Sequence, residues 1–154
     1  MVQPATIDLA AVEPVLAKYR GRGREALLPL LHEAQAVHGW LPREVLEAIG
    51  QTLHVPLSDI HGVVEFYSMF YNEPTARRVI RVCFDPACHM AGSPAVRLAI
   101  EERLGLRPGE TSADGRISYE CVPCLGMCEH APNALNGDRP AGDLTPADVD
   151  AFRA

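Results

Sequence analysis

All five cysteines of the chain fall into two short clusters. The first cluster is CFDPAC, from Cys83 to Cys88, and the second is CVPCLGMC, from Cys121 to Cys128. Four residues separate Cys83 from Cys88 and three separate Cys124 from Cys128, so each of these two pairs can hold one side of a single centre. The residue types and their spacing therefore indicate chemistry based on four thiolates.

Four thiolates suit either a tetrahedral zinc ion or an iron–sulfur cluster, because both bind soft, anionic sulfur ligands. Structural zinc usually takes tight cysteine pairs with about two residues between them. The intervals here are wider, and a wider loop can accommodate a metal centre larger than a single ion. A [2Fe-2S] cluster offers one iron to each pair, so the spacing favours an iron–sulfur cluster, and a structural zinc module remains the alternative.

Cys121 and Cys124 form a second, competing motif. The stretch CVPC resembles the redox-active dithiol of thioredoxins, in which the pair follows an early strand and opens a helix whose N-terminus lowers the thiol pKa. Here the pair follows a late strand and continues directly into LGMC. We therefore keep a thiol–disulfide oxidoreductase as an alternative function, and we expect Cys121 to be a spare thiol beside the cluster.

Composition excludes several classes of protein. The 154 residues can bury one good core or two small ones, and the apolar fraction of 47% is that of a globular protein. The formal net charge of −6 argues against a nucleic-acid partner and against anionic membranes. We find no secretory leader and no apolar run that could span a bilayer, and the odd number of cysteines disfavours a disulfide framework. A cytoplasmic protein without direct membrane insertion is expected.

The first half of the chain carries apolar residues at helical spacing. Four helices are expected from this pattern, one beginning after Asp8 and the others over 24–37, 42–53 and 58–66 with Ser58 as the last N-cap. Together they form a helical bundle. A DNA-binding helix-turn-helix is disfavoured, because the last helix carries Asp59 and Glu65 and no Lys or Arg to meet phosphate.

The second half of the chain alternates strands and helices. The pattern predicts a strand over 79–84, a helix over 93–104, a strand over 117–121, a hairpin around 134–141 and a closing helix over 145–152. Each of the two strands delivers one cysteine pair. The overall prediction is an α+β protein with a helical docking domain over 1–76 and a cluster-binding domain over 77–154.

Several motifs in this order resemble a known family. They are CFDPACHMAGS, CLGMCEHAP and LTPADVD, preceded by GREALLPLLHEAQAVHGWLP and VVEFYSMF. Over nearly its whole length the chain is similar to the small [2Fe-2S] subunit of the NADH-oxidising module of respiratory complex I. The same subunit type occurs as the gamma subunit of NAD-dependent formate dehydrogenases and in NAD-reducing hydrogenases. The resemblance implies an N-terminal helical bundle followed by a thioredoxin-like [2Fe-2S] ferredoxin domain.

The resemblance also assigns the cysteines. It implies that Cys83 and Cys88 bind one iron, that Cys124 and Cys128 bind the other, and that Cys121 is no ligand. One [2Fe-2S] cluster is expected on this chain, with FMN and NAD(H) on a partner flavoprotein subunit. The chain would then be a non-catalytic electron-transfer subunit of a larger NAD(H)-dependent oxidoreductase, peripheral to the inner membrane where its complex is bound there.

Three further expectations concern the surroundings of the cluster. His89 and His130 lie beside or near ligands, but four cysteines already fill the ligand positions, so both histidines are expected to face solvent or neighbour the ligands. The hairpin segment NALNGDRPAG contains Pro140, which predicts an irregular last hairpin. The aromatic stretch from Phe66 to Tyr71 is expected to form an apolar docking edge of the helical domain.

Overall fold

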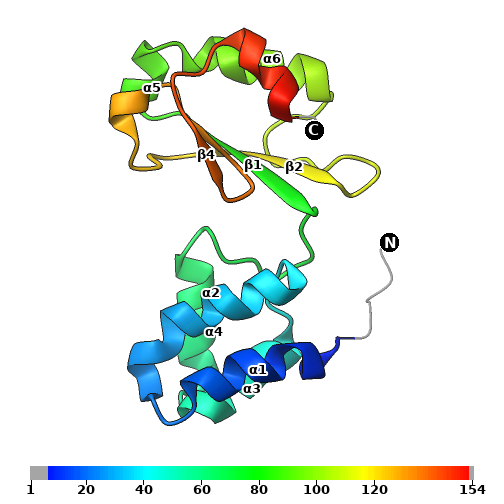
Figure 1. The fold of residues 1–154 in the computed structure, drawn as a ribbon, viewed down its shortest axis with the longest axis vertical. Helices are drawn as coiled ribbons and strands as arrows, with labels where there is room; N and C mark the ends of the chain where they lie inside the picture. Colours follow the sequence, from blue (N-terminus) through cyan, green and yellow to red (C-terminus); the bar gives the residue numbers. More distant parts are fainter. Residues whose placement is uncertain (1–6, 153–154) are drawn as a thin grey trace. The chain divides into compact units, whose positions relative to one another are not determined.

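The computed structural model describes residues 7–152 (Figure 1). The chain divides into two compact units, Met1–Pro74 and Thr75–Ala154. The first unit is helical and the second is built on a four-stranded sheet. In the described part of the chain, no helix has both the length and the apolar character that crossing a membrane requires.

Over residues 7–74, the helical unit contains four α-helices and one short 3-10 helix. They are α1 (Leu9–Tyr19), η1 (Gly23–Ala26), α2 (Leu27–His38), α3 (Arg43–Leu53) and α4 (Leu57–Phe66). The Asp8 side chain accepts a hydrogen bond from the Ala10 N–H at 2.9 Å and caps α1. Gly39, with φ of 79°, ends α2 in the left-handed conformation that glycine adopts without strain. The sequence order of helices is therefore confirmed.

The start of α4 differs from the sequence prediction. Its N-cap is Pro56, and the helix begins at Leu57, so the assignment of Ser58 as N-cap is wrong. Proline presets the φ angle that a helix entry needs, and the helix therefore starts immediately after it. The Ser58 hydroxyl lies inside the first turn instead, 3.4 Å from a carboxylate oxygen of Asp59.

The core of the helical unit combines apolar side chains from all four α-helices. Its completely buried members are Val12, Leu30, Leu31, Ala34, Val45, Ile49 and Ile60. Phe70 joins this core at 6% exposure, with its ring centroid 4.7 Å from that of His32. Phe66 is 79% exposed, and Tyr67 and Met69 are also exposed. The predicted aromatic edge is therefore wrong for Phe70, because the chain after α4 folds back and turns this ring inward.

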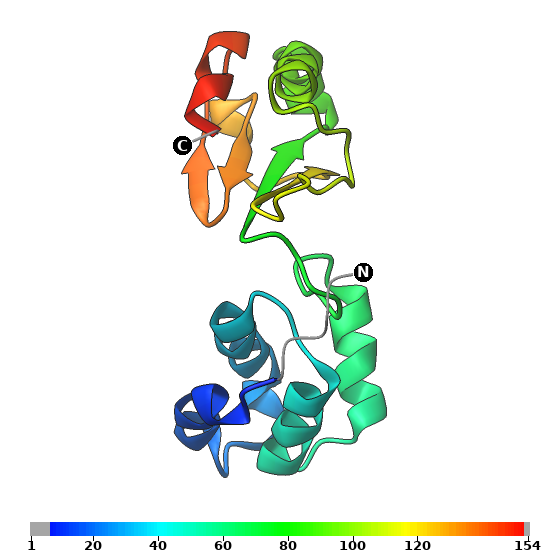
Figure 2. The same ribbon diagram turned by 90° about the vertical axis from the view of Figure 1, so that its right-hand side faces the viewer.

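The second unit alternates strands with short helices. Its elements are β1 (Arg78–Cys83), α5 (Pro86–Met90), α6 (Ser93–Leu104), β2 (Ile117–Val122), η2 (Cys128–His130), β3 (Ala134–Asn136), β4 (Arg139–Ala141) and η3 (Pro146–Phe152). The sheet order is β2-β1-β3-β4, with β1 parallel to β2 and the other pairs antiparallel. In Figures 1 and 2, α6 and η3 lie over one face of this sheet. The core lies between these two helices and the sheet. Ile80 on β1 and Tyr119 on β2 are paired side by side in it.

Three elements of this unit depart from the sequence prediction. Residues 86–90 form the short helix α5, which the sequence pattern did not reveal. The closing helix is the 3-10 helix η3 and not an α-helix. The last hairpin is regular, with Pro140 paired to Leu135, so the predicted irregularity is wrong. Pro140 lies on the edge strand β4, where the missing N–H of a proline removes no hydrogen bond between strands.

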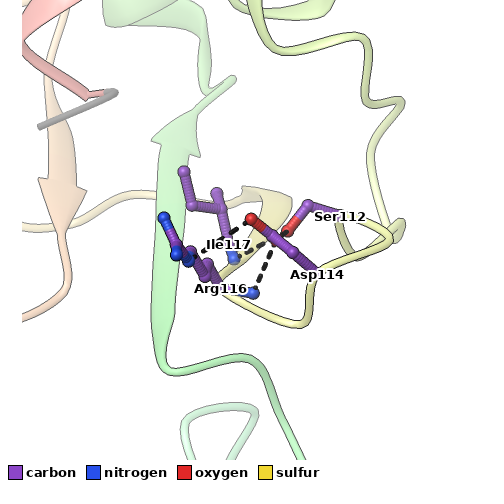
Figure 3. Close-up of polar contacts among 4 residues, drawn as sticks. All are labelled: Ser112, Asp114, Arg116 and Ile117. Carbon is purple, nitrogen blue, oxygen red and sulfur yellow. Dashed lines mark hydrogen bonds and ion pairs between the residues drawn. The ribbon is translucent and has the colours of Figure 1, made fainter.

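A tight polar turn leads into β2 (Figure 3). One carboxylate oxygen of Asp114 accepts hydrogen bonds from the Ser112 hydroxyl at 2.6 Å and from the Arg116 N–H at 3.0 Å. The Ser112 hydroxyl in turn accepts from the Ile117 N–H at 3.0 Å. The Ser112 hydroxyl, followed by the Arg116 N–H, holds the pKa of Asp114 below its usual value. The charged carboxylate therefore fixes the entry to the strand that leads to the second cysteine pair.

Replacement of Asp114 by alanine should lower the free energy of unfolding at about pH 7 and have less effect in acid. The pKa of Asp114 is lowered in the folded protein, so its contribution is complete above the unfolded pKa and is lost as the pH falls through the folded pKa. Urea unfolding at neutral and acidic pH measures this. Asp114→Asn keeps an acceptor that cannot titrate and serves as control; an alanine effect that is the same at every pH contradicts the prediction.

Candidate metal centre

Four cysteines meet at one end of the sheet unit, each carried by a different local structure. Cys83 is the last residue of β1, and Cys88 lies on α5. Cys124 lies in the loop after β2, and Cys128 opens η2. Cys83 and Cys88 are each 1% exposed, whereas Cys124 and Cys128 are exposed. All four thiols are free, one pair is buried, and the other pair is at the surface.

The sulfur atoms interact in pairs. The Cys124 and Cys128 sulfurs are 3.3 Å apart, and the Gly126 N–H donates to the Cys124 sulfur at 3.3 Å. Burial raises the pKa of the Cys88 thiol to about 11, and a hydrogen bond with the Cys83 side chain and the nearby charges of Cys83 and Cys128 add to this rise. The hydrogen bond with the Cys124 side chain raises the pKa of Cys128. A raised thiol pKa favours the protonated form, so metal binding at these thiols must release protons.

This donor set consists of two sulfur pairs. Within residues 7–152, no group of three or more His, Cys, Asp or Glu side chains is placed so that it could hold a metal ion. A [2Fe-2S] cluster needs two sulfur ligands on each of two irons. Soft thiolates are also the ligands that iron–sulfur clusters prefer. The residues present therefore fit a two-iron cluster.

Hydrogen bonds fix the backbone around the first pair. The Cys83 N–H donates to the Asn133 carbonyl at 3.1 Å, and the Cys83 carbonyl accepts from the Ser93 hydroxyl at 2.6 Å. Ser93 is completely buried at the start of α6. The Cys83 main chain is thus held on both sides before its side chain reaches the centre. In the sequence, Ser93 had indicated only the start of a helix.

Cys121 is partly buried beside the core of the unit. It lies on β2 opposite Val82, packs against the core, and its thiol donates to the Tyr119 hydroxyl at 3.4 Å. Burial, followed by this contact with Cys121, raises the pKa of Tyr119. Cys124, in contrast, pairs with Cys128. The structure therefore places the two cysteines of the CVPC motif in different surroundings.

The two histidines near the cysteines are both exposed. The Nδ1 atom of His130 lies 3.0 Å from a carboxylate oxygen of Asp143, and the Asp143 N–H donates to the His130 carbonyl at 2.9 Å. His89 lies on α5 and also faces solvent. The segment after Cys128 is therefore tied to the loop that follows β4.

Gly142 is the residue that permits this close approach. A Cβ atom at Gly142 would lie 2.5 Å from the Cβ of His130 and 3.0 Å from its carbonyl oxygen. Neither atom is the far end of a flexible side chain, so the backbone of the η2 segment would have to move. No sequence signal distinguished this glycine from those of ordinary turns.

Replacement of Gly142 by alanine is therefore expected to destabilise the sheet unit by about 1–3 kcal/mol, the usual range for overpacking. The same displacement should shift Cys128 and lower the iron retained per chain after purification. Gly62→Ala is the control, because a Cβ at Gly62 meets nothing within 4 Å and alanine favours helices. Equal iron contents and equal unfolding free energies for Gly142→Ala and the unchanged protein would show that the contact does not matter.

Comparisons with known proteins give a consistent result. The sequence matches the family described as thioredoxin-like [2Fe-2S] ferredoxin over residues 12–152. It is 39% identical over 126 residues to a subunit of the NADH-quinone oxidoreductase of Pseudomonas aeruginosa, covering 82% of this chain and 76% of the relative. It is 41% identical over 120 residues to the corresponding subunit of Aquifex aeolicus, covering 78% and 75%.

A solved structure is similar as well. An NAD+-reducing [NiFe]-hydrogenase in the H2-reduced state superposes with a TM-score of 0.73 at 29% sequence identity. The match covers 85% of this chain but only 22% of the hydrogenase chain. The similarity therefore concerns one part of that larger protein.

Proposed function

Because this chain belongs to the thioredoxin-like [2Fe-2S] ferredoxin family, we propose that it carries electrons within an NAD(H)-linked oxidoreductase. The family match spans both units, which confirms the predicted helical bundle followed by a thioredoxin-like ferredoxin domain. Membership of this family implies one [2Fe-2S] cluster on the chain. Its curated relatives are subunits of NADH-quinone oxidoreductases.

Four cysteines are proposed as the ligands. Cys83 and Cys88 bind one iron, and Cys124 and Cys128 bind the other. The observation that carries this assignment is the gathering of two sulfur pairs at the ends of β1 and β2. When bound, the cluster supplies reversible one-electron transfer, with no bond made or broken on a substrate. No catalytic side chain is therefore required of this chain.

The protein's own groups prepare this site. The burial of Cys83 and Cys88 keeps water away from one side, and the exposure of Cys124 and Cys128 leaves the other side open to an electron donor. The Gly126 N–H points at the Cys124 sulfur. Hydrogen bonds to sulfur and solvent exposure both set the reduction potential of such centres. The surface pair is thus the side at which we propose that electrons enter.

The electron donor is proposed to be a flavoprotein subunit that holds FMN and NAD(H). Relatives of this chain occur in NADH-quinone oxidoreductases and in an NAD+-reducing hydrogenase, and a formate-linked complex is a third candidate. Residues 1–76 are proposed as the docking domain, with Phe66, Tyr67 and Met69 exposed on it. A reducing cytoplasmic setting, peripheral to the membrane through the complex, would keep the four ligand thiols free for iron.

A reduction experiment in the assembled complex tests this proposal. The chain is produced with the flavoprotein subunit of its own complex, and NADH is added without air. Reduction of the [2Fe-2S] absorption by NADH in the complex, and none with the isolated chain, is the expected result. Failure of NADH to reduce the cluster in a complex whose flavin is itself reduced would refute the proposed donor.

A further inference from the structure

Two residues outside the ligand set connect the segment of the first cysteine pair to that of the second. The Asp85 side chain accepts from the Cys124 N–H, whereas Asn133 reaches Cys83 through its main-chain carbonyl and Met127 through its side chain. Asp85 lies inside the CFDPAC motif and Asn133 opens NALNGDRPAG, but the sequence does not reveal these contacts, because Asp85 is distant from Cys124 along the chain and Asn133 is distant from Cys83.

Asn133 contacts both ligand segments at once. Its carbonyl accepts from the Cys83 N–H at 3.1 Å. Its side-chain Nδ2 donates to the carbonyl of Met127, the residue before Cys128, at 2.7 Å. One residue thereby contacts the main chain of Cys83 and the peptide that precedes Cys128.

The orientation of the Asn133 amide follows from chemistry. A carbonyl oxygen can only accept, so the amide atom that faces Met127 must be the nitrogen. The residue is 1% exposed, and its Oδ1 atom has no hydrogen-bond partner among the described residues. A buried polar atom without a partner is unfavourable. The favourable contact of this buried amide is therefore the one that its nitrogen makes to Met127.

Asp85 makes the second connection. It precedes α5, which carries Cys88, and its Oδ2 accepts from the Cys124 N–H at 3.1 Å. The carboxylate therefore holds the main chain of one surface ligand to the loop of the buried pair. Together with Asn133 it constrains the second pair near both of its cysteines, at Cys124 directly and at Cys128 through Met127.

We propose that Asn133 is a positioning residue for the cluster and that, with Asp85, it fixes the spacing between the two cysteine pairs. This inference rests on the proposed function, since it presupposes that both pairs bind one cluster. A cluster whose two halves are held at a fixed spacing is lost slowly, because one pair cannot move away while the other still binds. Removing the Asn133 donor should allow the Met127–Cys128 segment to move.

The test compares matched substitutions on neighbouring residues. Asn133→Leu and Asn133→Asp both remove the side-chain donor, and only the second adds charge. Asn136→Leu and Asn136→Asp are the controls, because Asn136 lies three residues away on β3 and pairs through its backbone with Ile80 and Arg139. Each purified protein is given an iron chelator, and loss of the cluster absorption is followed in time. The electron paramagnetic resonance spectrum of each reduced protein is recorded as well.

Both Asn133 variants should lose the cluster roughly tenfold faster or more, which is the usual effect of removing a hydrogen bond behind a metal ligand. Their resonance spectra should also shift relative to the Asn136 variants. Loss at the wild-type rate with an unchanged spectrum in both variants would overturn the proposal. A change in Asn133→Asp alone would also overturn it, because charge and not the donor would then be responsible.

A second pair of variants keeps the proposal testable if Asn133 variants do not fold. Asp85→Asn keeps an oxygen acceptor for the Cys124 N–H, whereas Asp85→Ala removes it. Faster cluster loss in Asp85→Ala than in Asp85→Asn supports the proposal, and equal rates contradict it. Absence of a cluster from the unchanged protein would refute the proposed function itself, which separates the two failures.

Discussion

Alanine at any one of Cys83, Cys88, Cys124 or Cys128 is expected to leave a chain that cannot retain a [2Fe-2S] cluster, whereas Cys121→Ala is expected to retain it. Each of the four supplies one of the four ligands that two irons need. Alanine is preferable to serine, because a serine oxygen can itself bind iron. Iron and labile sulfide are assayed after reconstitution, together with the visible absorption.

The metal-free chains give an internal control for this experiment. Cys83 and Cys88 are buried, so alanine there also removes packed volume and should lower the free energy of unfolding. Cys124 and Cys128 are exposed, and alanine there should leave the stability of the metal-free chain nearly unchanged. Retention of a normal cluster by Cys124→Ala or Cys128→Ala would contradict the ligand assignment. Loss of the cluster in Cys121→Ala would favour the alternative in which Cys121 and Cys124 form a redox-active dithiol.

Leu30→Ala is expected to destabilise the helical unit by about 2–5 kcal/mol, the usual range for removing a completely buried leucine. Each unit has its own hydrophobic core, so the cluster should remain bound while the helices unfold. Under the proposed docking role, this variant should also fail to bind the flavoprotein subunit. Urea unfolding is followed by far-ultraviolet circular dichroism for the helices and by visible absorption for the cluster.

Leu28→Ala is the matched control for this prediction. Leu28 lies on the same helix, α2, but is 38% exposed, so its replacement should have a smaller effect on stability. For Leu30→Ala, the urea transitions of the helices and of the cluster are expected to separate. For the control, the two transitions should lie close together. Loss of helix and cluster at the same urea concentration in Leu30→Ala would show that the two units unfold together.

Much of the fold follows from local sequence patterns. The apolar residues of α2 and α3 recur at helical spacing, and the β-branched run that ends at Cys83 has the composition of a buried strand. The family resemblance, carried by the residues around the two cysteine pairs, is confirmed by the family match. These features depend on residues close together in the chain, which explains why the sequence alone indicates them.

Other features depend on contacts between distant residues. The helix α5 spans only five residues, too few for a periodic pattern. The burial of Phe70 depends on the fold-back of the chain after α4, and an aromatic run by itself does not distinguish core from surface. Asn133 contacts a residue 50 positions earlier, Cys83, so its place beside the ligands becomes visible only when the strands pair.

Cluster content is the most direct test of the central claim. The protein is purified without air, its iron and acid-labile sulfide are assayed, and the electron paramagnetic resonance spectrum is recorded before and after dithionite. The account predicts a brown protein with about two irons and two sulfides per chain and a signal only after reduction. A colourless protein, holding zinc or no metal and unchanged after reconstitution with iron and sulfide, would contradict it.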